Sequence, residues 1–156
     1  MATNDEIEDL LTRLAGIPER ISRSVKGWDE AELHTRPATS EWSASEILAH
    51  IRASDDILAY RAYAILARNN PPLVAYDERR WAEVARYAQS NFQISLSAFT
   101  LKRADLVQML RAIAPADWKR TGIHEVHGPQ SLLHGMNTLL EHEEVHCTQL
   151  EAIYHK

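Results

Sequence analysis

Residues 130–154, QSLLHGMNTLLEHEEVHCTQLEAIY, form the stretch that decides the fold. Apolar residues and histidines recur in it at steps of three and four, which is the period of a helix face turned into a bundle core. The members of this stripe are Leu132, Met136, Leu139, His142, His146, Gln149 and Ile153. The spacing predicts one long helix over residues 130–154 whose inward face carries two histidines.

His142 and His146 lie four residues apart on this predicted helix. At that spacing two side chains are about 40° apart around the axis with Cβ atoms ~5–6 Å apart, so both imidazoles can reach one cation. A chain with eight histidines can contain such a pair by chance, and the position of the pair on the apolar stripe is therefore the stronger signal. Buried imidazoles need partners, and a metal ion with a third ligand would satisfy both.

The composition is that of an ordinary globular protein and predicts one domain over residues 1–156. The net charge is -5 and the basic residues are scattered, which argues against a nucleic-acid-binding surface. Residues 1–14 are acidic where a signal peptide is basic, and no apolar run approaches the ~20 residues of a membrane span. We therefore expect a cytoplasmic protein that does not enter a membrane. The single cysteine, Cys147, excludes an internal disulfide and is expected to pack as a small apolar residue.

Two earlier segments carry clear helix signals. Apolar residues at helical spacing span residues 7–25, where Pro18 predicts a kink or a fresh helix start. Ser43 followed by Glu46 is a capping box, which predicts that a second helix begins at Ser43 and runs to about Arg68.

The remaining segments complete the predicted architecture. Residues 29–33 suggest one short helical turn, and residues 73–88 suggest a long crossover with a short helical piece that covers the mouth of a pocket. A third main helix is predicted over residues 90–113, and residues 115–128 form the last connection before the fourth. Because no segment shows the two-residue period of a strand, the sequence predicts an all-α four-helix bundle with a long crossover between helices two and three.

His50 is the candidate third ligand, since it lies on the inward stripe of the second helix with the small Ser54 one turn later. Arg61 follows eleven residues after His50, ~16 Å further along nearly the same side, where it could bind an anionic substrate or form a surface ion pair. Tyr76 and Trp81 of the crossover are further candidates for substrate binding. Arg103 interrupts the apolar row of the third helix, which favours an ion pair with a carboxylate on a facing helix over a contact with an anionic ligand.

The other five histidines are expected at the surface, because they lie in connections or off the core stripe: His34, His124, His127, His134 and His155. His124 and His127 are also candidates for the rim of a pocket.

Residues 142–146 also satisfy the HExxH pattern of zinc peptidases, in which the glutamate acts as general base. The elongated form of this pattern has a glycine three residues and a third histidine ligand six residues after the second histidine. Here those positions hold Gln149 and Ala152, so the third ligand is missing. A di-iron bundle would need two Glu-x-x-His units, and only Glu143 and His146 form one. A third alternative is that the three candidate histidines are unrelated core or surface side chains.

Taken together, several motifs resemble the DinB-like (DinB/YfiT) superfamily over nearly the whole chain, from about Ile7 to Ile153. The segments that carry the resemblance are residues 41–51, the Pro71-Pro72 crossover with residues 77–81, residues 99–103, Gly128-Pro129, and His142, His146 and Gln149. The resemblance implies a four-helix bundle that holds a divalent metal, usually nickel, zinc or iron, on His50, His142 and His146. It also implies low-molecular-weight thiols as co-substrates in some members and dimers in several. Glu143 stands where many relatives have Asp.

The leading hypothesis is a metal-dependent enzyme that performs thiol transfer or metal-assisted hydrolysis on a small molecule. Three neutral imidazoles leave positions on a metal open for water or a thiolate, as in a catalytic site. Glu143 is a tentative catalytic residue, although a solvated glutamate on the helix surface is slightly favoured. The competing hypothesis is a bundle without catalytic activity, with a structural metal or none, that serves dimerisation or ligand sensing.

Overall fold

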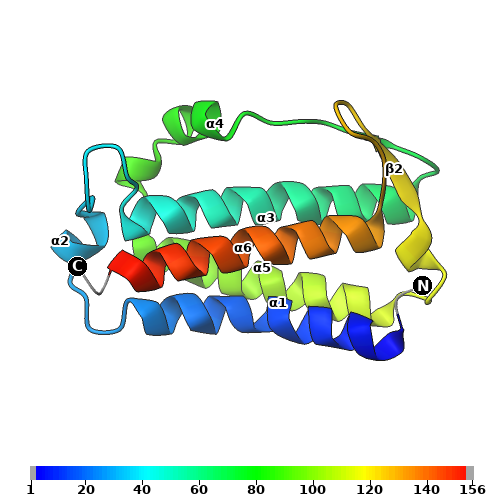
Figure 1. The fold of residues 1–156 in the computed structure, drawn as a ribbon, viewed down its shortest axis with the longest axis horizontal. Helices are drawn as coiled ribbons and strands as arrows, with labels where there is room; N and C mark the ends of the chain where they lie inside the picture. Colours follow the sequence, from blue (N-terminus) through cyan, green and yellow to red (C-terminus); the bar gives the residue numbers. More distant parts are fainter. Residues whose placement is uncertain (1–2, 154–156) are drawn as a thin grey trace.

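The computed structural model describes residues 3–153 and shows four long helices packed side by side (Figure 1). These helices are α1 (Asn4–Ser24), α3 (Ala44–Ala67), α5 (Phe92–Ala112) and α6 (Leu132–Ile153), with the short α2 (Glu30–His34) between the first two. Both α1 and α3 pack against α5 and against α6, so the order around the bundle is α1, α5, α3, α6. The predicted four-helix bundle is confirmed.

The start of α3 follows the prediction from its capping box. The Ser43 side chain accepts a hydrogen bond from the backbone N–H of Glu46, and the Glu46 carboxylate accepts one from the backbone N–H of Ser43. The helix ends at Ala67 with Arg68 as its C-cap. This register points His50 into the bundle, where its side chain is fully buried.

A fresh helix start at Pro18 is wrong, because α1 is one helix with Pro18 inside it. A proline removes the N–H that would bind the carbonyl four residues earlier, here that of Leu14. That carbonyl instead accepts a hydrogen bond from Nη1 of Arg103, at 2.9 Å. Leu14 and Ile21 are fully buried on either side, so the apolar stripe continues through the proline.

The connections contain more regular structure than the sequence predicts. The crossover after α3 holds β1 (Pro72–Leu73), α4 (Glu78–Val84) and the 3-10 turn η1 (Tyr87–Gln89), which confirms the short helical piece. The last connection holds the 3-10 turn η2 (Asp117–Lys119), β2 (Thr121–His124) and β3 (Gly128–Ser131). The strands form a sheet in the order β1-β2-β3, with β1 parallel to β2 and β2 antiparallel to β3.

The expectation that no strands occur is therefore wrong for the connections. Strands of two and four residues are too short to show a two-residue period, so no periodic pattern predicts them. Because β3 occupies the predicted first residues of helix four, α6 begins at Leu132. The predicted end at Tyr154 lies outside the described residues. The third helix is shorter than predicted at both ends and starts after its N-cap, Asn91.

The crossover runs back along α3 and brings its residues onto that helix in order (Figure 1). Glu78 approaches His50, Tyr76 hydrogen-bonds Ser54, and the backbone of Val74 binds Arg61. The crossover thus covers the side of α3 that carries the candidate site residues. Within residues 3–153, no helix is long and apolar enough to span a membrane.

Candidate metal centre

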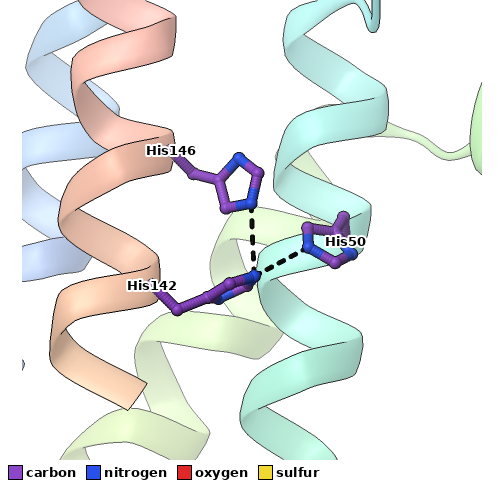
Figure 2. A group of neighbouring side chains, drawn as sticks. All are labelled: His50, His142 and His146. Atoms are coloured by element: carbon purple, nitrogen blue, oxygen red, sulfur yellow. Dashed lines mark hydrogen bonds between the residues drawn. The ribbon is translucent and has the colours of Figure 1, made fainter. Parts of the chain in front are cut away.

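Three imidazoles converge between two adjacent helices, α3 and α6 (Figure 2). Nε2 of His142 lies 2.9 Å from Nε2 of His50 and 3.2 Å from Nε2 of His146. One nitrogen of each ring lies within 4.8 Å of the others. His50 comes from α3 and is buried, whereas His142 and His146 come from α6 and are partly exposed. The structure therefore brings together the three histidines that the sequence predicts as ligands.

The hydrogen bonds of the cluster fix which ring nitrogen can carry a proton. Nδ1 of His146 lies 2.9 Å from Oε1 of Gln149, so it donates to that oxygen and leaves a lone pair on Nε2. The three Nε2 atoms then face one another, and three neutral rings cannot provide enough protons and lone pairs to match every contact. Nδ1 of His50 and of His142 is buried without a partner among the described residues. A cation between the three Nε2 atoms resolves this conflict, with protons on the outer nitrogens.

The spacing of these nitrogens suits a shared metal ion. Nitrogens that each lie ~2.0–2.1 Å from one metal are separated by roughly 2.9–3.4 Å, depending on the coordination angle. The two observed Nε2 separations, 2.9 and 3.2 Å, are within this range. Neutral imidazole is a good ligand for zinc, nickel and iron. The donor set thus fits a divalent transition metal.

Burial keeps two of the imidazoles in the form that binds metals. Burial first, and the neighbouring imidazoles second, lower the pKa of His50 to about 3 and that of His142 to about 4. Both rings are therefore neutral at pH 7, and their lone pairs are available. Trp42 packs against His50 with ring centroids 5.0 Å apart, which holds that ring in place.

Glu78 is a site residue that the sequence analysis missed. Its Oε2 atom lies 3.3 Å from Nε2 of His50, although its side chain is otherwise exposed. It lies in the first turn of α4, whose N-cap is Asp77. Its position depends on how the crossover folds over α3, and no spacing in the sequence relates it to the histidines.

A cavity of about 1000 Å³ gives access to His142 and His146. Its wall includes Trp42, Glu78, Arg79 and Arg86. The whole wall carries three arginines and four glutamates, so it suits a small polar molecule: Arg36, Arg79, Arg86, Glu41, Glu46, Glu78 and Glu83.

Glu143 is not among the residues that approach the histidines. Its side chain is fully buried and is bound by Arg103 through Nη2 at 2.5 Å and Nη1 at 2.9 Å. Nη2 of Arg103 also donates to Asp55 at 2.7 Å. The prediction that Glu143 is a solvated glutamate on the helix surface is wrong. The sequence predicts that Arg103 pairs with a carboxylate on a facing helix, and Glu143 and Asp55 are its partners. Burial and the nearby Asp55 charge raise the pKa of Glu143 to about 7, although Arg103 opposes this.

The three candidate substrate-binding residues do not line the cavity beside the histidines: Arg61 lies on α3, and Tyr76 and Trp81 lie in the crossover. Arg61 donates to the carbonyl of Val74 at 2.5 Å, and Tyr76 shares a 2.8 Å hydrogen bond with Ser54. The Trp81 ring packs at a tilt of 57° against Tyr76, with ring centroids 5.4 Å apart. The contacts of Arg61 and Tyr76 fasten the crossover to α3.

Of the remaining histidines, His124 differs from the prediction. It is buried in β2, because the sheet that the sequence did not reveal covers it. It lines a second cavity together with His127 and His134, which agrees with the expected pocket rim for the first two. His34 is partly exposed, and His155 lies outside the described residues.

The fold and the site define a helical bundle protein with a candidate three-histidine metal centre. The model of the DinB superfamily matches residues 13–150, and the chain belongs to this superfamily. The resemblance seen in the sequence is thereby confirmed.

Individual relatives are similar over almost the whole chain. A protein of Oceanobacillus iheyensis, provisionally named a metal-dependent hydrolase, is 23% identical over 97% of this chain and 87% of its own length. A protein of Bacillus mycoides with the same provisional name is 21% identical over the same shares of the two chains.

Two solved structures share the fold. YfiT from Bacillus subtilis, described as a probable metal-dependent hydrolase with an unusual four-helix bundle topology, superposes with a TM-score of 0.90 at 17% identity. That match covers 98% of this chain and 88% of YfiT. The mycothiol-dependent maleylpyruvate isomerase superposes with a TM-score of 0.74 at 18% identity, over 96% of this chain and 63% of that one.

Proposed function

We propose that this protein is a divalent-metal-dependent hydrolase of a small molecule. The observation that carries the proposal is the convergence of three imidazole nitrogens on one point beside an open cavity. The provisional names of the relatives agree with it. We also propose that residues 1–156 form one domain, that the protein acts in the cytoplasm, and that the metal is zinc, nickel or iron.

His50, His142 and His146 would hold the metal, which when bound lowers the pKa of a coordinated water towards ~7 and so supplies a nucleophile. Gln149 fixes the tautomer of His146 by accepting its Nδ1 proton. Glu78 lies beside the cluster with its carboxylate open to the cavity, and we assign it the role of proton acceptor for that nucleophile. Arg79 and Arg86 on the cavity wall would orient an anionic group of the substrate.

A thiol-dependent transferase is the second candidate. The same open centre would deprotonate a bound thiol. The fold shared with a mycothiol-dependent isomerase favours this candidate, and the cavity has room for a low-molecular-weight thiol beside a second substrate. The zinc peptidase is disfavoured, because Arg103 binds the glutamate that would serve as its base. A bundle that holds its metal only for stability is the alternative that the tests below address. We also propose that the protein forms a homodimer.

Metal content tests the centre directly. We expect the purified protein to contain one divalent ion per chain, and we expect His50→Ala, His142→Ala and His146→Ala each to lose it. His34→Ala is the matched control, because it removes an imidazole that contacts Glu30 and Ser45 and is not a member of the cluster. Mass spectrometry of the metals in each variant provides the measurement. A metal-free wild type, or three variants that keep their metal, would overturn the proposal.

The cobalt-substituted protein distinguishes the two candidate activities. A thiol that coordinates the metal adds a thiolate-to-cobalt charge-transfer band to the near-ultraviolet spectrum, whereas a hydrolase substrate does not. If bacterial thiols leave the spectrum unchanged while simple esters or amides are turned over, the hydrolase stands. A new band with thiol transfer to a model electrophile would favour the transferase. Metal content without either activity would favour the structural role.

A further inference from the structure

A second polar cavity lies towards the other end of α3. Its volume is about 870 Å³, and its wall includes Arg61, His124, His127, Ser131 and Thr138. It shares no lining residue with the cavity beside the metal centre. Arg61 follows His50 by eleven residues, which places it ~16 Å further along the helix. The two cavities are therefore separate sites on one face of the bundle.

The hydrogen bonds of His124 determine its tautomer. Its Nδ1 atom accepts the backbone N–H groups of Val126 at 3.2 Å and of His127 at 3.3 Å. An Nδ1 that carried a proton would face two donors, so the proton of the neutral ring lies on Nε2. His127 stacks on the ring at 4.8 Å and holds its orientation. The buried His124 thus presents an Nε2–H donor.

The Nε2–H group of His124 points at a second hydrogen-bond donor, on Arg61. Nη2 of Arg61 lies 3.3 Å from Nε2 of His124, and because both atoms carry protons they cannot hydrogen-bond to each other. Arg61 has no carboxylate within ion-pair distance among residues 3–153 and uses Nη2 to bind the carbonyl of Val74. Its Nε atom is buried without a partner.

The charged groups around this donor pair compensate the positive charge only in part. Burial lowers the pKa of Arg61, and the first opposing influences are Tyr76 and Glu125. The carboxylate of Glu125 accepts the backbone N–H of Ala75 at 2.9 Å instead of binding Arg61. Burial and then the Arg61 charge lower the pKa of His124, which keeps that ring neutral. A metal cation would be repelled here, whereas an anion would satisfy both donors.

The geometry points to an oxyanion-binding site, for a phosphate or carboxylate group of a small molecule, held between Arg61 and Nε2 of His124. Ser131 and Thr138 supply hydroxyl groups on the same wall. The N-terminus of α6 follows directly after Ser131 and adds a favourable helix dipole. The inference does not depend on the metal centre, since no ligand of the cluster contributes to it.

Anion titrations of the metal-loaded protein test this site. The probes are inorganic phosphate in one arm and succinate in the other, with binding measured by calorimetry. We expect saturable binding of at least one probe, and the arm that binds more tightly identifies the preferred anion. Arg61→Gln and His124→Asn are each expected to weaken it by about tenfold or more, because each removes a charge-assisted or buried hydrogen bond.

Three further variants make the result decisive. Arg61→Lys keeps the positive charge but loses the planar guanidinium, so it should bind the anion more weakly than wild type does. It also serves as the folded variant if Arg61→Gln does not fold. Arg111→Gln is the matched control, because that exposed arginine pairs with Glu8 at the far side of the bundle. His142→Ala should bind the probe as wild type does even if it loses metal. The proposal is overturned if neither anion binds saturably, if both cavity variants bind normally, or if His142→Ala alone abolishes binding.

Discussion

Two buried polar clusters lie close together in the bundle, and they differ in whether a central charged group pairs their members. In the first, Arg103 binds the carboxylates of Asp55 and Glu143 and the carbonyl of Leu14. Nε of Arg103 has no hydrogen-bond partner among the described residues, but its other two nitrogens pair every other member of the first cluster. In the second, His50, His142 and His146 direct their Nε2 atoms at one another and match only part of their donors and acceptors. Glu143 belongs to one cluster and its neighbour His142 to the other.

The difference separates a structural cluster from a binding site. A buried polar group costs free energy unless it is paired, and Arg103 pairs groups from three other helices. Its role is to hold α1, α5, α3 and α6 in one arrangement. The histidine cluster lacks a central partner, and an added cation would complete it. Arg61 and His124 direct two donors at each other, and there an anion rather than a cation would pair with them.

Removal of the central arginine should have the largest effect. Arg103→Met would leave two buried carboxylates and the Leu14 carbonyl without their donor, and we expect it to lower the free energy of unfolding by about 3–5 kcal/mol. Urea denaturation at pH 7 measures the loss. Arg111→Met is the control, since its exposed ion pair with Glu8 should contribute about 1 kcal/mol or less. Equal losses in the two variants would show that the buried cluster does not hold the helices together.

Metal binding should stabilise the protein through the incomplete cluster. At a free metal concentration of 100 times Kd, the gain is about 2.7 kcal/mol, which corresponds to several degrees in Tm. His142→Ala should abolish the shift on addition of zinc or nickel. Its neighbour provides the contrast, because Glu143→Gln should be less stable than wild type yet keep the shift. Thermal unfolding with and without metal distinguishes the two, and a shift that persists in His142→Ala would place the metal elsewhere.

Glu78 tests whether a residue of the crossover completes the histidine cluster. Glu78→Gln keeps the shape of the side chain but loses its charge, and we expect metal affinity or hydrolytic activity to fall by about 10–100-fold. Glu19→Gln is the control, because its exposed carboxylate pairs with Arg23 on α1 and does not line the cavity. Separate measurement of kcat and KM adds a specific readout, since loss of a proton acceptor should lower kcat more than it raises KM. Unchanged kcat and metal affinity would limit Glu78 to covering the site.

The sequence was sufficient for the parts of the molecule whose signals are local or periodic. The core stripes predicted the four helices, and the same stripes placed His50, His142 and His146 inside the bundle. The role of Glu143 could not be read in this way. It lies beside the stripe, and its burial depends on Arg103, which is distant in sequence and on another helix. Glu78 and His124 depend on the folded connections, whose short strands have no periodic pattern.

The smallest effect is expected at Glu46, which is buried like Glu143 but lies at the edge of the first cavity. Burial alone would raise its pKa, yet hydrogen bonds from Arg36 and from Ser43 hold the pKa of this carboxyl below its usual value of 4.5. A carboxyl whose pKa is lowered by folding stabilises the protein above pH 4.5, and this contribution is lost as the pH falls below that value. Glu46→Gln removes the charge and weakens the capping box, so it should cost about 1 kcal/mol at pH 7.

The pH dependence separates this capped carboxylate from one that is merely buried. The difference in unfolding free energy between wild type and Glu46→Gln should shrink as the pH is lowered from 7 to below 4.5, because both side chains are then uncharged. Urea denaturation at several pH values measures it, with Glu8→Gln as an exposed control. A difference that grows towards acid pH would mean that the Arg36 and Ser43 contacts do not offset the burial of Glu46. That carboxylate would then resemble Glu143, whose pKa is raised despite its arginine, and completeness of hydrogen bonding alone would not explain which buried charges are stable.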